Sequence, residues 1–132
     1  IQFVNQFGTD KFTKVLIPNL FANTLNQDQI DAALKIAQSS TSEGIINALN
    51  AMKNRPDRSQ LLQNSQLANL IIAGKKDPLI PYLSLITLAS QMPLVQLNVL
   101  AESSHMGFIE ETENSLNILS YYLNNFALYP NK

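Results

Sequence analysis

The stretch LIIAGKKDPLIP, residues 70–81, decides the fold. It opens with a short apolar run that ends at Gly74. The length of this run, its isoleucines and the bounding glycine favour a β-strand that is buried on both faces. Asp77 lies in the loop that follows, and Pro81 suits the first turn of a helix. The stretch therefore predicts a strand, a loop that carries an acid, and a helix, in that order.

A second strand follows this helix. Val95, Leu97 and Val99 alternate with polar residues, which is typical of a strand. Two strands joined by a helix form a parallel β-α-β unit with a right-handed crossover. A loop then covers residues 101–108, and a last helix begins at Thr112. The apolar stripe of this helix is Leu116, Leu119, Leu123 and Phe126.

Helices account for the chain before residue 65. Thr9, Asn26 and Ser42 suit the N-cap positions of three helices, and Pro56 ends the third. The apolar positions at helical spacing are Phe12, Val15, Leu16, Leu20, Ile30, Ala33, Leu34, Ala37, Ile45, Leu49 and Met52. The chain thus reads as helices followed by strand, helix, strand and helix, which indicates the α/β class.

Asp77 follows the first strand and His105 follows the second. Functional residues gather at the carboxyl ends of parallel strands, so we expect the carboxylate and the imidazole to meet there. The carboxylate would fix the imidazole tautomer and leave the other ring nitrogen to take a proton from a nucleophile. Taken singly, such an Asp is more often a turn former and such a His more often a surface residue. On pattern alone, both interpretations stay open.

Residues 70–81 resemble a stretch of the α/β-hydrolase family in which a strand ends in Gly and the catalytic acid follows. The segment SHMGFIEE, residues 104–111, resembles that family's histidine loop. The resemblance maps the family's acid onto Asp77 and its histidine onto His105. Ser104 departs from the pattern, because the family usually has Gly before the histidine.

The resemblance covers nearly the whole chain and implies a partial α/β-hydrolase fold. Residues 1–65 resemble the helical cap of lidded members. Residues 66–132 resemble the C-terminal part of the core, a parallel β-α-β-α unit. The family's nucleophile elbow, Gly-x-Ser-x-Gly, and its oxyanion loop are absent from the sequence. We expect both to lie upstream of Ile1, which makes this chain the C-terminal half of a longer protein.

The implied activity is hydrolysis of a small apolar ester or lactone by the complete parent, with the present chain inert alone. An Asp nucleophile would instead imply an epoxide hydrolase or a dehalogenase. A non-catalytic ligand-binding or interaction fragment is a third alternative, since fold does not determine function. Tyr82, Met106 and Phe108 are candidates for the substrate pocket, although apolar residues near a loop more often serve packing. Glu110 and Glu111 precede the last helix, where carboxylates favour the helix dipole.

Composition excludes several other classes of function. The net charge of −1 comes from scattered charges, so no basic face suggests nucleic acid or an anionic membrane as a partner. The chain has no Cys and a single His, which excludes thiol catalysis and makes a multi-histidine zinc site improbable. Acyl transfer of this kind needs no cofactor or metal. The absence of Cys and of a recognisable leader favours a cytoplasmic location.

The strand within residues 70–73 is apolar throughout and is typical of the centre of a sheet. Its second edge would lie open in this chain, and an open apolar edge is a template for association. We therefore expect the partner to be the N-terminal half of the same protein or a second copy of the segment.

Overall fold

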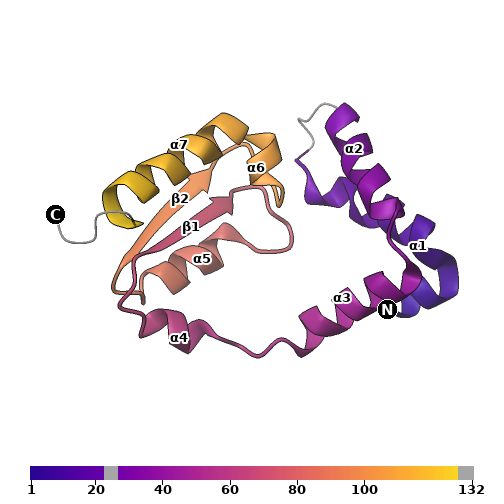
Figure 1. Cartoon of the computed structure of the whole chain (residues 1–132), viewed down its shortest axis with the longest axis horizontal. Helices are drawn as coiled ribbons and strands as arrows, with labels where there is room; N and C mark the ends of the chain where they lie inside the picture. Colours follow the sequence, from indigo (N-terminus) through magenta and orange to yellow (C-terminus); the bar gives the residue numbers. More distant parts are fainter. Residues whose placement is uncertain (23–26, 128–132) are drawn as a thin grey trace. The chain divides into compact units, whose positions relative to one another are not determined.

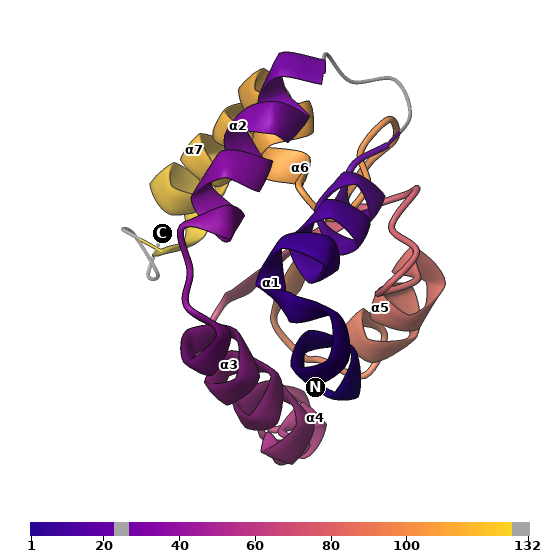
Figure 2. The same cartoon turned by 90° about the vertical axis from the view of Figure 1, so that its right-hand side faces the viewer.

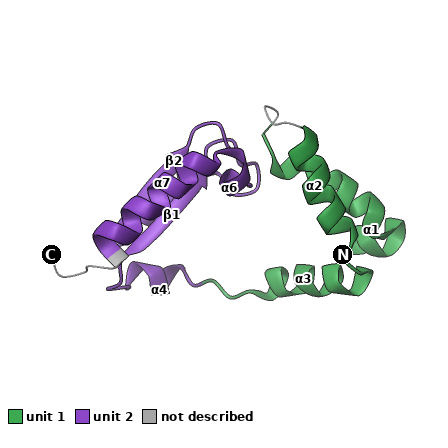
Figure 3. Ribbon diagram, turned by 45° about the horizontal axis from the view of Figure 1, so that its top comes forward, with its two compact units in different colours: residues 1–57 green, residues 58–132 purple. Residues whose placement is uncertain are grey.

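The computed structural model describes residues 1–22 and 27–127 and divides into two compact units. Unit 1 covers Ile1–Asp57 and unit 2 covers Arg58–Lys132 (Figure 3). The division falls earlier in the chain than the expected boundary at residue 65. Unit 2 carries both residues of the expected acid–histidine pair.

Unit 2 contains a parallel β-α-β arrangement. β1 (Asn69–Gly74) pairs in parallel with β2 (Val95–Leu100), and Gly74 lies opposite Leu100. α5 (Tyr82–Ala89) joins the two strands and contacts both of them. The order of the elements and the parallel pairing confirm the predicted unit.

Helices flank the two strands. α5 lies on one side of the pair and α7 (Thr112–Tyr122) lies on the other (Figures 1 and 2). The hydroxyl of Tyr122 donates a hydrogen bond of 2.6 Å to the carbonyl of Ala68, which ties the end of α7 to the start of β1. The remaining elements of unit 2 are α4 (Ser59–Gln63), α6 (Gly107–Glu110) and a π turn (Leu123–Ala127).

Strand β1 is not buried on both faces, so that prediction is wrong for this chain. Ala73 is 2% exposed, but Ile72 is 37% exposed. The reason is the width of the sheet, which has two strands within the described residues. A pair of strands is too narrow to bury an apolar strand as a central strand is buried.

The predicted apolar stripe of α7 is also exposed. Leu116 is 56% exposed and Leu119 is 42% exposed. The less exposed residues of this helix are Ser115, Ile118 and Tyr122. Unit 2 therefore has an exposed apolar helix face in addition to the exposed part of β1.

The end of β1 passes very close to the loop that contains His105. A Cβ atom at Gly74 would lie 1.9 Å from the carbonyl oxygen of Ser104, so the backbone approach leaves no room for a side chain. Beyond Gly74, the N–H groups of Lys75 and Lys76 donate 2.9 Å hydrogen bonds to the carbonyls that end β2 and follow it, those of Leu100 and Ser103. These contacts hold the two strand-end loops together.

We expect Gly74→Ala to lower stability, because either the Ser104 backbone or β1 must move to accept the methyl group. Overpacking of this kind costs about 1–3 kcal/mol. The measurement is the urea midpoint at one protein concentration. Gly44→Ala is the matched control, since its Cβ would meet only the Thr41 hydroxyl, at 3.2 Å. Equal midpoints for the Gly74 variant and the wild type would show that the close approach carries no constraint.

Unit 1 is helical. α1 (Gln2–Leu16) contacts both α2 (Gln27–Gln38) and α3 (Ser42–Asn54), as Figure 2 shows. Gly8 interrupts α1 with a φ of 80°, so the helix expected from Thr9 forms the second part of a longer, kinked element. The other element of unit 1 is the 3-10 turn Pro18–Leu20.

Three details of unit 1 differ from the sequence prediction or lie beyond it. The N-cap of α3 is Thr41, not Ser42, because the Thr41 hydroxyl accepts the hydrogen bond from the first turn at 3.1 Å. Val15 and Met52 belong to the predicted apolar positions, but they are 57% and 61% exposed. Asn26, the expected cap of α2, lies outside the described residues.

Candidate active site

Asp77 lies in the loop between β1 and α5. Its N–H donates to the carbonyl of Gly74 at 3.4 Å. Its Oδ1 atom accepts the N–H groups of Leu79 at 2.8 Å and Ile80 at 3.1 Å. One carboxylate oxygen thus shapes the turn, which is the ordinary role of Asp after a strand. The second oxygen remains available for the neighbouring loop.

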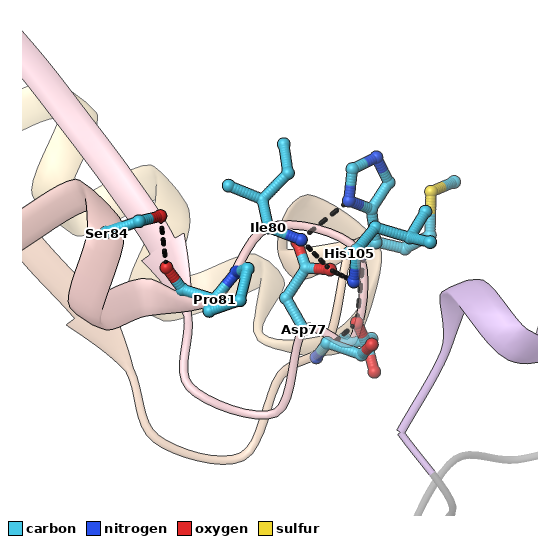
Figure 4. Close-up of polar contacts among 9 residues, drawn as sticks. Asp77, Ile80, Pro81, Ser84 and His105 are labelled. Atoms are coloured by element: carbon cyan, nitrogen blue, oxygen red, sulfur yellow. Dashed lines mark hydrogen bonds and ion pairs between the residues drawn. The ribbon is translucent and has the colours of Figure 1, made fainter.

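That second oxygen contacts the histidine. Asp77 Oδ2 lies 2.8 Å from His105 Nδ1, which is hydrogen-bond distance (Figure 4). The contact joins the loop after β1 to the loop after β2, as the placement of the two residues beyond parallel strands predicts. The same Asp side chain therefore forms the turn with one oxygen and contacts the imidazole with the other.

The surroundings of Asp77 keep its carboxylate ionised. The side chain is 8% exposed. Burial raises the pKa of Asp77. The hydrogen bonds from His105 and from the N–H groups of Ile80 and Leu79 lower this pKa, and together they outweigh burial, so the pKa lies below the usual 3.8. Asp77 is therefore negatively charged at neutral pH.

We expect the Asp77 carboxyl to titrate below pH 3.8. Because the pKa of Asp77 is lower in the folded state, the ionised carboxylate stabilises the folded chain, and this stabilisation is fully present above the unfolded pKa. That stability is lost as the pH falls through the folded pKa. Carboxyl ¹³C NMR measures the midpoint, and His105→Ala should raise it by removing one hydrogen bond. A midpoint at or above 3.8, or a midpoint that is the same in the wild type and in His105→Ala, would contradict this geometry.

The imidazole of His105 is held on one side and open on the other. Its side chain is 35% exposed. Figure 4 shows one ring nitrogen toward Asp77 and the second pointing away from it. A carboxylate can accept a hydrogen bond but cannot donate one, so Nδ1 carries a hydrogen, and in the neutral imidazole Nε2 then presents a lone pair. An imidazole in this state can accept a proton at Nε2, and the carboxylate stabilises the resulting cation.

A hollow of about 320 Å³ adjoins the pair. Asp77 and His105 line it together with apolar side chains that include Ile80, Leu85 and Phe108. Of the three residues predicted for a substrate pocket, Phe108 lines this hollow. Tyr82 and Met106 are not among its lining residues.

A larger hollow, of about 440 Å³, lies at the opposite end of the strands. Its lining includes Asn69, Val95 and Tyr122 but no histidine and no carboxylate. Of these two hollows, the smaller is lined by Asp77 and His105.

In residues 1–22 and 27–127, no group of three His, Asp or Glu side chains is arranged to hold a metal ion. No helix in the same residues has the length and apolarity needed to cross a bilayer.

Most of the chain is similar in structure to parts of solved esterases. It matches an esterase from Thermogutta terrifontis with 22% identity and a TM-score of 0.85, covering 93% of this chain and 46% of that one. It matches an esterase from Exiguobacterium antarcticum with 22% identity and a TM-score of 0.82, covering 94% and 46% of the two chains. A bromoperoxidase from Bacillus anthracis matches with 18% identity and a TM-score of 0.72, over 89% of this chain and 43% of that one. No family model and no curated protein matches the sequence.

These likenesses concern the fold, since all the identities are low. The chain has part of the α/β-hydrolase fold, as the sequence motifs predict. It spans about half the length of the solved structures that it matches. The Asp77–His105 pair thus lies within a partial α/β-hydrolase fold.

Proposed function

We propose that this chain supplies the acid and the histidine of a hydrolase that cleaves carboxylic esters or lactones. The observation that carries the proposal is the 2.8 Å contact between Asp77 Oδ2 and His105 Nδ1 at the carboxyl ends of two parallel strands. Asp77 orients the imidazole, and His105 acts first as a general base and then as a general acid. The esterase-like neighbours support the same class of chemistry.

The reaction begins when His105 Nε2 takes the hydroxyl proton of a serine nucleophile. The serine oxygen bonds to the ester carbonyl carbon, and the imidazolium then returns the proton to the departing alcohol. A water molecule attacks the acyl intermediate by the same route and releases the acid. The chain's own contribution is to hold the imidazole, to accept the proton at Nε2 and to stabilise the charge with Asp77.

The serines beside His105 do not provide this nucleophile. Ser103 is 0% exposed, and its hydroxyl donates to Glu111 at 2.8 Å. Ser104 is 2% exposed. Neither lies on a strand–turn–helix elbow, which is where this fold places its serine. The nucleophile and the oxyanion donors belong to the remaining half of the fold, and we use "complete protein" for this chain joined to that half.

The hollow beside the pair supports a small apolar substrate. Ile80, Leu85 and Phe108 contribute apolar surface within reach of the imidazole. Apolar walls with a few polar groups are the usual lining of a small-molecule site. The acyl portion of a short ester or a lactone ring fits this description.

A serine-directed fluorophosphonate probe tests the class of nucleophile in the complete protein. We expect covalent labelling of a serine outside this chain, and loss of labelling in the His105→Ala variant. Turnover of epoxides or haloalkanes without such labelling would indicate an Asp nucleophile and overturn the ester assignment. Absence of both turnover and labelling would indicate a ligand-binding protein.

A further inference from the structure

A single carboxylate oxygen binds the backbone on both sides of His105. Glu110 Oε2 accepts the N–H of Ser104 at 2.9 Å and the N–H of Met106 at 3.1 Å. The two donors belong to the residues immediately before and after the histidine.

We propose that Glu110 is a positioning residue that fixes the backbone at His105 and thereby aims its imidazole at Asp77 and at the nucleophile. The inference rests on the proposed function. The Ser104 N–H belongs to the peptide group between Ser103 and Ser104, and the Met106 N–H belongs to the peptide group that follows His105. The two hydrogen bonds thus brace the short segment that contains the His105 Cα and limit the direction of its Cα–Cβ bond, while the contact of Nδ1 with Asp77 restrains the side-chain torsions.

The neighbouring carboxylate, that of Glu111, binds the residues that precede Ser104. Glu111 Oε2 accepts the N–H of Glu102 at 3.0 Å and the hydroxyl of Ser103 at 2.8 Å. The carbonyl of Ser103 in turn accepts the N–H of Lys76, the residue before Asp77. The acid loop and the histidine loop are therefore joined through Ser103 as well as through the Asp77–His105 contact.

A carboxylate is a suitable acceptor at residue 110 because the part of the loop that it binds, at Ser104, is buried. Ser103 and Ser104 are 0% and 2% exposed, so water cannot easily satisfy the N–H of Ser104. Hydrogen bonds to an ionised acceptor are about twice as strong as neutral ones. Removal of the acceptor would leave buried donors unpaired and allow the loop to rearrange. A displacement of about 1 Å at a reacting group can cost about 10²-fold in rate.

The test compares Glu110→Ala with Glu110→Gln, whose amide oxygen still accepts but carries no charge. In the complete protein we expect kcat for a p-nitrophenyl ester to fall about 10²-fold in the Ala variant and less in the Gln variant. KM should stay within about twofold, because Glu110 does not face the hollow. Glu113→Ala is the matched control, since Glu113 is an exposed carboxylate on α7, and its kcat should equal that of the wild type.

A second readout needs no catalysis. The chain has one His, so the ¹⁵N spectrum of the imidazole reports His105 alone. The signature of a hydrogen-bonded Nδ1 proton should be strong in the wild type, weaker in Glu110→Gln and lost in Glu110→Ala. If Glu110→Ala does not fold, a lower kcat and a weaker signature in Glu110→Gln still support the proposal.

Wild-type kcat and signature in either folded variant would overturn the positioning role, as would a loss confined to KM. If the wild-type protein has no esterase activity but the Nδ1 signature weakens in the Glu110 variants as expected, the proposed function is refuted and the positioning role of Glu110 is supported.

Discussion

Replacing His105 with alanine should lower the kcat of the complete protein on a p-nitrophenyl ester by at least about 10⁴-fold, because loss of a triad residue costs this factor or more. Without the imidazole, no side chain of residues 1–22 and 27–127 stands in the place of Nε2 to accept the nucleophile's proton. Asp77→Asn should lower kcat by about 10⁴-fold. The amide NH2 group that replaces Oδ2 can donate to Nδ1, which favours the tautomer with the hydrogen on Nε2. Initial-rate kinetics over a range of substrate concentrations measures both effects.

The control for these variants is Glu102→Gln. The Glu102 side chain makes a 2.6 Å ion pair with Lys76 close to the site, but the two side chains are 69% and 40% exposed. Exposed pairs contribute little, so kcat should be unchanged. Undiminished turnover in His105→Ala, or equal losses in His105→Ala and Glu102→Gln, would refute the mechanism.

Isolation of the present chain should produce an associated species and no ester turnover. Ile72 on β1 and the stripe of Leu116 and Leu119 on α7 are exposed apolar surface. We propose that the remaining half of the fold covers them, since the esterases of similar structure are about twice as long as this chain. Size-exclusion chromatography with light scattering should therefore give a mass above 14.7 kDa for the chain alone.

Variants of α7 test whether the exposed stripe drives this association. Leu116→Glu should weaken association, because a charge replaces an apolar contact. Asn117→Glu adds the same charge beside the stripe and should leave association unchanged. Addition of the missing half should convert the chain to a 1:1 complex, whereas a persistent symmetric dimer would assign the surface to a second copy. A stable 14.7 kDa monomer with a cooperative melt would contradict the proposal.

Local sequence signals predicted the core of unit 2 well. The apolar run before Gly74 and the alternation from Val95 to Val99 became the two parallel strands. The spacing of strand and loop also placed Asp77 and His105 at the same sheet edge. These features follow from backbone periodicity and turn chemistry, which a single sequence carries.

Burial and loop hydrogen bonding were harder to predict. Periodicity shows which residues share a helix face, but it cannot show whether anything covers that face, so the exposure of Leu116 does not follow from the sequence. The roles of Glu110 and Glu111 were assigned to a helix dipole because sequence spacing does not show where a loop turns back. Their carboxylates instead accept backbone N–H groups of the histidine loop.

The most direct test of the proposed pair is the tautomer of the single imidazole. ¹⁵N NMR of the chain should show His105 at neutral pH with the hydrogen on Nδ1, held in a hydrogen bond that disappears in Asp77→Asn. A histidine that carries its hydrogen on Nε2, or whose spectrum is the same with and without the Asp77 carboxylate, would contradict the assignment of these residues as an acid–base pair.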